Sequence, residues 1–232
     1  MISYVFDVDG TLTPSRLTIN SDFQLFFQKW MKNKKVYLVT GSDKEKTIEQ
    51  IGEILWNSVT RVYQSCGNQV WEKGKLIKEN EFYLSAKMEN TLNTFLETSQ
   101  WKEKFGNHIE QRIGLVNFSI IGRECSLEKR EAYYAWDNIN RERERICDYI
   151  MQKFPDIEAS IGGQISIDIH HLGLNKAQVL DDIPGKIYFF GDRMDQAGND
   201  YPIVKRLQES EREYRLFKVE NPKDTWKILQ NL

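Results

Sequence analysis

Residues 4–13 read YVFDVDGTLT and carry the clearest structural signal in the chain. A short run of aromatic and β-branched side chains ends at Asp7, and Asp9 and Gly10 follow at once. Such a run predicts a buried strand, here over residues 2–6, whose carboxyl end opens into a loop. Glycine permits a sharp turn, so Gly10 would allow both carboxylates to point into one cleft.

Other segments repeat this arrangement of an apolar run followed by a polar loop. VYLVTGSD (36–43), KIYFFGDRMDQAGND (186–200) and YRLFKVEN (214–221) each predict a further strand. The spacing of apolar residues predicts helices over 21–35 and over 42–55, with Ser42 as the N-cap of the second. Strands that alternate with helices predict an α/β fold with a doubly wound parallel sheet, whose site lies at the carboxyl ends of the strands.

The middle of the chain predicts a different kind of structure. We expect a helix over 84–97, strands over 115–122 and 164–171, and one long charged helix over 127–153. These elements indicate an inserted α+β domain. We therefore predict a core formed by residues 1–82 and 173–232, with a second domain over 83–172.

Composition excludes several classes of partner. The 232 residues include 32 Lys and Arg against 34 Asp and Glu, and a net charge of -2 gives no overall field that would attract nucleic acid. The 3 cysteines lack CxxC spacing, which favours a reducing compartment. The segment MISYVFDVDG predicts neither a secretory signal nor a membrane span. We expect a cytoplasmic protein that binds neither nucleic acid nor membrane.

Two neighbouring carboxylates suggest a chemical role for the first loop. Asp7 and Asp9 would repel each other unless a cation or a shared proton relieved them. Mg²⁺ prefers oxygen ligands, and Asp192 would be the natural third acid from a neighbouring strand end. One aspartate could then attack while the other handles the proton. The alternative is that both residues only cap a turn, because Asp-Gly is common turn chemistry.

The whole set of motifs resembles the haloacid dehalogenase superfamily. The string hhhDxDGT, the strand that ends in TGS, a later lysine and a later GD occur in the order typical of that superfamily. The resemblance implies phosphoryl transfer through an aspartyl-phosphate. The roles it implies are Asp7 as nucleophile, Asp9 as general acid/base, Thr40 or Ser42 as holder of a phosphoryl oxygen, Lys176 as neutralising charge, and Asp7, Asp9 and Asp192 as Mg²⁺ ligands.

The inserted domain carries a second set of candidate residues. Arg112, Arg123 and Arg130 lie in RIGLVNFSIIGRECSLEKR (112–130), and a guanidinium fork can bind two oxygens of a non-reacting phosphate. Ser166 and Asp168 would share one face of a strand and suit sugar hydroxyls. The alternative for these two is an ordinary polar strand face.

These segments are similar to the cap domain of the eukaryotic-type α-phosphomannomutases. The family pattern runs roughly R-x-G-x-x-N-x-S-x-I-G-R, then C-[ST]-x-E-x-R and G-G-x-I-S-x-D, and LTPSR (12–16) also matches it. The resemblance makes Arg16 a further substrate contact. It also implies a hexose phosphate substrate, a hexose 1,6-bisphosphate activator, a homodimer through the cap, and a supply of mannose 1-phosphate for nucleotide-sugar synthesis.

The chain departs from the family pattern at several positions. Gln164, Leu174, Asn175, Met194 and Ala197 replace residues usual in the family. An acidic segment that can hold a second cation in the family reads Val204, Lys205 and Arg206 here, so we expect one Mg²⁺ site. We expect Arg141, Arg143 and Arg145 to form a solvated helix face with i,i+4 pairing rather than a phosphate site.

Three functions remain open from the sequence. The first is a phosphohexomutase that interconverts mannose, or glucose, 1-phosphate and 6-phosphate. The second is a sugar-phosphate phosphatase with the same nucleophile, in which water discharges the aspartyl-phosphate. The third is a catalytically silent module that binds sugar phosphate or a protein partner.

Overall fold

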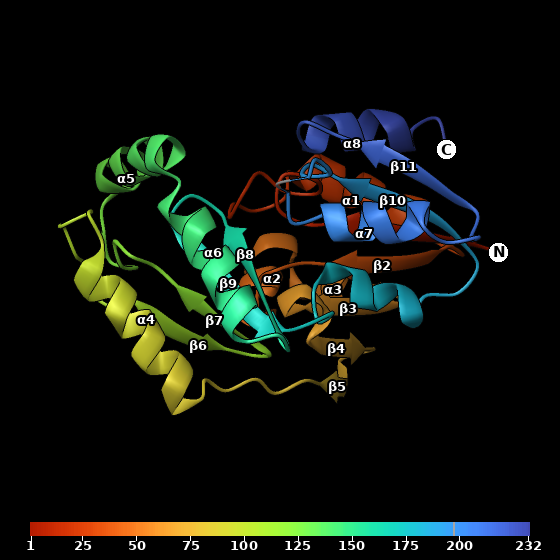
Figure 1. Cartoon of the computed structure of the whole chain (residues 1–232). Helices are drawn as coiled ribbons and strands as arrows, with labels where there is room; N and C mark the ends of the chain where they lie inside the picture. The colour runs from red at the N-terminus through yellow and green to blue at the C-terminus, as the bar shows by residue number, and fades with distance from the viewer. Residues whose placement is uncertain (197) are drawn as a thin grey trace. The chain divides into compact units, whose positions relative to one another are not determined.

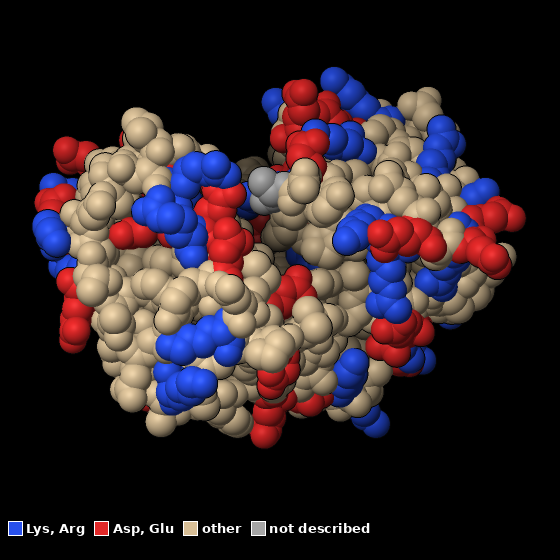
Figure 2. Space-filling model, in the orientation of Figure 1, with Lys and Arg blue, Asp and Glu red and all other residues tan. Residues whose placement is uncertain are grey.

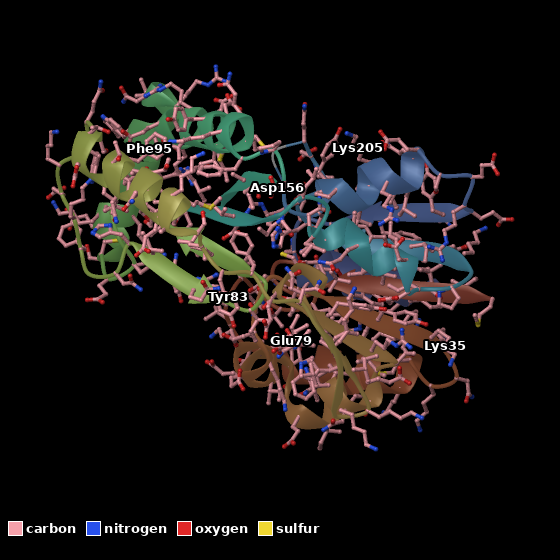
Figure 3. All side chains as sticks on the ribbon, turned by 60° about the horizontal axis from the view of Figure 1, so that its bottom comes forward. Lys35, Glu79, Tyr83, Phe95, Asp156 and Lys205 are labelled. Carbon is pink, nitrogen blue, oxygen red and sulfur yellow. The ribbon has the colours of Figure 1, made fainter. Side chains whose placement is uncertain are left out.

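The computed structural model describes residues 1–196 and 198–232, so the departure at Ala197 lies outside the described residues. The chain divides into two compact units (Figure 1). The core unit comprises Met1–Glu79 and Leu174–Leu232, and the inserted unit comprises Asn80–Gly173. Glu79, labelled in Figure 3, is the last residue of the first core segment, and Tyr83 belongs to the inserted unit. Basic and acidic side chains intermingle on the face drawn in Figure 2.

One sheet runs through the core unit in the order β11-β10-β1-β2-β3-β4-β5. The strands from β11 to β3 pair in parallel, whereas β4 and β5 add antiparallel strands at one edge. The bounds are β1 Ile2–Asp7, β2 Lys35–Val39, β3 Arg61–Gln64, β4 Gln69–Glu72, β5 Lys75–Glu79, β10 Lys186–Gly191 and β11 Tyr214–Lys218.

Both faces of the sheet are buried at its central strands β10, β1, β2 and β3, because successive side chains there enter different apolar clusters. Val5 lies in one cluster and Phe6 in the other. On the Phe6 face, the rings of Phe6 and Phe190 stack with centroids 4.5 Å apart, and Phe190 stacks on Phe217 at 4.4 Å. The predicted doubly wound α/β fold is confirmed.

Helices cover each face of the sheet (Figure 1). The Phe6 face packs against α1, α2, α3 and α8, and the Val5 face packs against α7 and the 3-10 helix η2. Their bounds are α1 Ser21–Trp30, α2 Lys44–Ile51, α3 Glu53–Ser58, η2 Lys176–Asp181, α7 Tyr201–Gln208 and α8 Pro222–Leu229, and the 3-10 turn η1 is Ser65–Gly67.

The helix predicted over 42–55 is wrong in two respects. Gly52 adopts φ 79 and separates α2 from α3. The N-cap of α2 is Asp43, whose side chain accepts the N–H of Lys46 at 2.8 Å. Ser42 precedes this cap: its N–H donates to Thr40 Oγ1 at 3.0 Å and its hydroxyl donates to Asp9 Oδ2 at 3.4 Å. Ser42 therefore belongs to the loop after β2 rather than to the helix.

The inserted unit contains an antiparallel sheet in the order β6-β7-β9-β8. Val116, Phe118, Ile167 and Ile169 face a separate apolar cluster that includes side chains from its helices. The intervening residues of the same strands are largely polar, so the other face of the sheet is polar. The bounds are β6 Ile109–Arg112, β7 Leu115–Phe118, β8 Ile157–Gly162, β9 Ser166–His171, α4 Ala86–Thr98, α5 Leu127–Asn140 and α6 Glu142–Lys153.

The single long helix predicted over 127–153 is wrong. Arg141 adopts the left-handed conformation with φ 52, and it ends α5 and precedes α6. A non-glycine residue in this region interrupts a helix and redirects the chain. The charged sequence gave no signal for this break, since neither glycine nor proline occurs there.

Across residues 1–196 and 198–232, no helix has both the length and the apolar character needed to cross a membrane.

Gly10 provides a test of the loop after β1. Its φ is +83, and a Cβ atom there would lie 2.3 Å from Asp192 Oδ2. Gly173 has the same φ of +83 but open space around the corresponding position. We expect Gly10→Ala to reduce the free energy of unfolding by about 1–3 kcal/mol more than Gly173→Ala, because only Gly10→Ala adds overpacking to backbone strain. Thermal and urea unfolding of both variants measure this difference, and equal losses would contradict the close approach of Asp192.

Candidate active site

The loop after β1 places Asp7 and Asp9 in different surroundings. Asp7 is the last residue of β1 and is only 3% exposed. The carbonyl of Val8 accepts N–H groups from Leu12 at 2.9 Å and from Thr13 at 3.0 Å, which folds the loop back on itself. Gly10 completes this turn without a Cβ atom, and Asp192 occupies the space that a side chain would need. The turn therefore brings Asp192 beside the Asp7 loop.

Three carboxylates meet at this end of the sheet. Asp7, Asp192 and Asp200 each offer one oxygen within 4.8 Å of the others. They come from the end of β1, from the residue after β10, and from the residue before α7. Since Phe6 pairs with Phe190 in the parallel register, the two strands end side by side. The structure thus brings together Asp7 and Asp192, as predicted, but the third member of the group is Asp200.

Asp9 lies outside this group of three among the described residues. Its Oδ1 accepts the backbone N–H of Arg16 at 2.6 Å and the Nε2 of Gln50 at 2.9 Å. Its Oδ2 accepts the hydroxyl of Ser42 at 3.4 Å. The geometry therefore does not support the metal-ligand role predicted for the Asp9 carboxylate. The hydrogen bonds from Arg16, Gln50 and Ser42 instead fix this carboxylate in the loop after β1.

Lys176 supplies the positive charge of the site. It is the first residue of η2, and it is only 1% exposed. The Nζ atom donates to Asp7 Oδ1 at 2.5 Å and to Asp200 Oδ1 at 2.7 Å. Burial opposes the charged ammonium, but the carboxylates of Asp200 and Asp7 outweigh it and raise the pKa of Lys176. Lys176 is accordingly protonated at neutral pH.

The carboxylates themselves are under electrostatic strain. Burial raises the pKa of Asp7 well above its ordinary value; the Lys176 ammonium opposes this effect, and Asp200 and Asp192 add to it. Burial also raises the pKa of Asp192, and Asp200 reinforces the shift. Three acids therefore share one buried lysine, and the excess negative charge is suited to a hard cation with oxygen ligands.

Thr40 and Ser42 lie at the end of the next strand. Asp7 pairs with Val39 in the register of β1 and β2, so Thr40 follows directly at the same edge of the sheet. Thr40 is fully buried and its Oγ1 accepts the N–H of Ser42, while the Ser42 hydroxyl reaches Asp9. The structure thus brings the two predicted phosphate-binding residues together and joins them to Asp9.

The cap candidates form a second group within the inserted unit. Glu110, Asn117 and Asp168 pair directly across β6, β7 and β9 on the polar face of the sheet. Arg112 contacts Glu110 Oε2 at 2.7 Å, and Arg123 contacts the same oxygen at 3.2 Å. The shared carboxylate holds these two predicted arginines close together.

Ser166 and Asp168 extend the group along β9. Arg123 donates to Ser166 Oγ at 2.9 Å, and Asp168 accepts the amide of Asn117 at 2.6 Å. Arg130 donates to the backbone carbonyl of Arg123 at 3.3 Å. Arg112, Arg123, Arg130 and Ser166 are therefore joined by polar contacts, and Asp168 lies on the same face of the sheet with Asn117 as its partner.

The expectation of a solvated face is wrong for Arg143. Arg141 and Arg145 are exposed, but Arg143 is only 2% exposed and its Nε donates to Asp137 at 2.7 Å. The break at Arg141 changes the helical phase after residue 140, so a periodicity drawn through one long helix puts Arg143 on the wrong side.

Sequence reasoning also missed Asp200 and Gln50. Asp200 lies in the quoted GDRMDQAGND segment, and its acidic side chain just before a predicted helix was the available signal. Gln50 holds Asp9 from α2, where a glutamine in an amphipathic helix has no distinctive signature.

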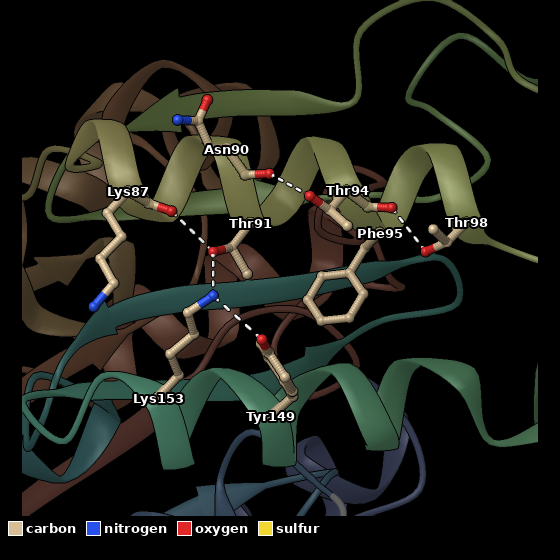
Figure 4. A pocket seen from close by; sticks show the side chains of 8 residues that line it. All are labelled: Lys87, Asn90, Thr91, Thr94, Phe95, Thr98, Tyr149 and Lys153. Atoms are coloured by element: carbon tan, nitrogen blue, oxygen red, sulfur yellow. Dashed lines mark hydrogen bonds between the residues drawn. The ribbon is translucent and has the colours of Figure 1, made fainter.

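A groove of about 420 Å³ between α4 and α6 is separate from the predicted cap residues (Figure 4). Thr91, Thr94 and Thr98 line it, and each hydroxyl donates to a carbonyl of its own helix. Lys153 donates to Thr91 Oγ1 at 3.1 Å and to Tyr149 OH at 3.2 Å. None of the predicted site residues lines this groove.

The chain has the fold of haloacid dehalogenase-like proteins. A haloacid dehalogenase-like hydrolase from Bacteroides thetaiotaomicron has a similar structure, with a TM-score of 0.62, 12% identity, and coverage of 99% of this chain and 98% of that one. A trehalose-6-phosphate phosphatase related protein has a TM-score of 0.59, 19% identity, and coverage of 99% and 96%. At these identities the likeness concerns the fold alone.

Sequence comparison gives the family. The profile of eukaryotic phosphomannomutase matches residues 23–232. A phosphomannomutase of Galdieria sulphuraria is 34% identical over 98% of this chain and 93% of its own length. That of Saccharomyces cerevisiae is 32% identical over 98% and 92%. The chain belongs to the eukaryotic phosphomannomutase family.

Asp7→Asn tests the electrostatic strain in the site. Below the ordinary pKa of 3.8, Asp7 is protonated in both the folded and unfolded states, so the wild type and the variant should differ least. As pH rises, ionisation of Asp7 penalises the folded wild type, because its pKa there is raised. With divalent cations removed by a chelator, we expect the variant to melt about 2–4 °C above the wild type at neutral pH.

Thermal unfolding across a pH series measures this difference, with Asp156→Asn at an exposed aspartate as the control. A variant that melts below the wild type at every pH would mean that the Asp7–Lys176 ion pair outweighs the burial of the carboxylate.

Proposed function

We propose that this protein interconverts hexose 1-phosphate and hexose 6-phosphate, with mannose phosphate as the main substrate, through an aspartyl-phosphate on Asp7. The observation that carries this proposal is the buried Asp7 carboxylate, held by Lys176 at 2.5 Å at the carboxyl end of a parallel strand, in a chain of the phosphomannomutase family. A nucleophilic carboxylate paired with a fixed positive charge suits phosphoryl transfer.

The reaction divides between Asp7 and Asp9. A carboxylate oxygen of Asp7 attacks phosphorus in a hexose 1,6-bisphosphate; the bond from phosphorus to the sugar oxygen breaks, and Asp9 donates a proton to that oxygen. A hexose 1-phosphate then enters, and its 6-hydroxyl attacks phosphorus on Asp7; Asp9 accepts the hydroxyl proton, the bond from Asp7 to phosphorus breaks, and hexose 1,6-bisphosphate forms again. This bisphosphate reorients so that Asp7 can attack its other phosphate, which releases hexose 6-phosphate. Asp9 Oδ1 accepts two hydrogen bonds, whereas Oδ2 accepts one, from the Ser42 hydroxyl at 3.4 Å, so Oδ2 is the oxygen that exchanges the proton.

Other core residues stabilise the transferring group. Lys176 neutralises charge beside Asp7, and Asp200 holds the ammonium from its other side. Thr40 and Ser42 bind a phosphoryl oxygen. Asp7 and Asp192 hold one Mg²⁺. The group suits this cation because its three carboxylates outnumber its one lysine. When bound, Mg²⁺ would neutralise negative charge on the carboxylates and the phosphoryl oxygens.

The inserted unit acts as the cap and binds the rest of the substrate. Arg16 from the core and Arg112, Arg123 and Arg130 from the cap bind the non-reacting phosphate. Ser166 and Asp168 bind sugar hydroxyls. Asn117 Oδ1 is buried beside Asp168 with no hydrogen-bond partner among the described residues, and a hydroxyl from the sugar would satisfy it.

The resemblance to the family also supports a proposal for the assembly and the cellular setting. We propose a cytoplasmic homodimer that associates through the cap, with a hexose 1,6-bisphosphate as activator and mannose 1-phosphate as a supply for nucleotide-sugar synthesis. These statements rest on the resemblance of residues 112–176 to the family pattern.

Phosphorus NMR tests the reaction. Mannose 1-phosphate, Mg²⁺ and a catalytic amount of glucose 1,6-bisphosphate should yield mannose 6-phosphate with the wild type. Asp7→Asn should reduce this rate at least about 1000-fold, because it removes the nucleophile while the fold is retained. A chelator should stop the wild-type reaction, and added Mg²⁺ should restore it. Growth of inorganic phosphate alone would identify a sugar-phosphate phosphatase instead.

Arg123→Ala tests the binding of the distal phosphate. Loss of a charge-assisted hydrogen bond costs about 1.5–3 kcal/mol, so kcat/KM for mannose 1-phosphate should fall roughly 10- to 100-fold. Hydrolysis of a small monophosphate ester, which carries no second phosphate, should change little. Arg145→Ala at an exposed position is the matched control. An equal loss on both substrates would rule out a specific role in distal phosphate binding.

A further inference from the structure

A buried ion pair lies at the junction of α5 and α6, outside every site described above. Asp137 is 4% exposed and Arg143 is 2% exposed. Arg143 Nε donates to Asp137 Oδ2 at 2.7 Å, and the backbone N–H of Arg143 donates to Asp137 Oδ1 at 3.0 Å. The carboxylate is therefore bound at both oxygens by one residue.

The guanidinium group reaches from this junction to the turn between β8 and β9. Arg143 NH1 donates to the carbonyl of Gly163 at 3.0 Å and to the carbonyl of Ser166 at 3.3 Å. Its central carbon lies 5.9 Å from the ring centre of Tyr133. A single planar fork thus joins two helices to both ends of one turn.

The two ends of this turn, residues 163–165, are held differently. Gly163 adopts φ +59 with nothing within 4 Å of the position of a Cβ atom, so it makes no side-chain contact. Ile165 is 1% exposed in the apolar cluster of the inserted unit, and its carbonyl accepts the hydroxyl of Ser119 at 2.9 Å. The hydrogen bonds from Arg143 hold the glycine end and the residue that follows the turn. A buried ion pair gives little net stability compared with apolar residues of similar size, so its main effect here is geometric.

The turn leads directly into the predicted substrate contacts. Ser166 is the first residue of β9; its carbonyl accepts Arg143, and its Oγ accepts Arg123 NH1 at 2.9 Å. Asp168 follows on the same face of the strand. A shift of the Ser166 backbone would therefore move the hydroxyl that holds the Arg123 guanidinium.

We propose that the Asp137–Arg143 pair is a positioning element that sets Ser166 and Arg123 for recognition of the sugar phosphate. The proposal rests on the proposed substrate-binding role of these two cap residues. Neither Asp137 nor Arg143 needs to touch the substrate, because the pair acts through the backbone of the β8–β9 turn and through the Ser166 hydroxyl.

Arg143→Lys is the primary test, since lysine keeps the charge but cannot bind Asp137 and both carbonyls in one plane. We expect the KM for mannose 1-phosphate to rise about tenfold or more. Turnover of a small monophosphate ester should stay within about twofold of wild type, because the core residues are unchanged. Arg145→Lys, which makes the same change at an exposed position, is the control. An unchanged KM in Arg143→Lys would overturn the proposal.

A double-mutant cycle with Ser166→Ala separates positioning from general destabilisation. If Arg143 acts through Ser166, adding Arg143→Lys to Ser166→Ala should raise the KM much less than it does in the wild type. Full additivity of the two effects on KM would contradict this connection. If Arg143→Lys does not fold at the assay temperature, the combined variant Asp137→Asn with Arg143→Gln removes both charges and takes its place in the cycle.

A measurement without substrate keeps this proposal distinct from the proposed function. In the wild type, Arg123 Nε lies 3.2 Å from Glu110 Oε2. The nitrogen-15 NMR signal of this Nε should therefore be sharp, and its proton should exchange slowly with water. Arg143→Lys should broaden or shift that signal, whereas Arg145→Lys should leave it unchanged. An unaffected Arg123 signal would overturn the positioning role. Failure of the wild type to form mannose 6-phosphate would overturn the proposed function alone.

Discussion

The Lys176 ammonium group, buried between Asp7 and Asp200, is the interaction on which the core unit depends. It joins β1, η2 and the start of α7. In the sequence, the entire inserted unit separates β1 from η2. Removing the Lys176 ammonium would leave two buried carboxylates without their counter-charge and would cost about 3–5 kcal/mol. The two segments of the core must therefore assemble correctly before these charges can be buried.

Parallel pairing explains why the reactive groups converge. The register aligns Asp7 with Val39 and Phe6 with Phe190, so the residues that follow β1, β2 and β10 emerge at one edge of the sheet. The apolar rows beneath this edge fix the register, because a shift by one residue would move the side chains of each cluster to the opposite face of the sheet. Stability of the core and alignment of the site thus have the same origin.

Local signals made part of this arrangement predictable. A buried strand that ends in DxDG identifies its own reactive end, so Asp7 and Asp192 could be placed near each other from the alternation of strands and helices. The burial of Arg143 could not be predicted, because it depends on the left-handed conformation of Arg141, and no glycine in the sequence indicates that conformation. Gln50 and Asp200 act through tertiary hydrogen bonds to Asp9 and Lys176, and no local periodicity encodes such partners.

The core unit carries an unbalanced group of charges. Three carboxylates, those of Asp7, Asp192 and Asp200, lie around the one buried ammonium of Lys176. Their mutual repulsion lowers the stability of the free protein, and a bound cation would relieve it. The free energy lost to this repulsion is recovered when the cation binds, so the same geometry that weakens the free core strengthens binding.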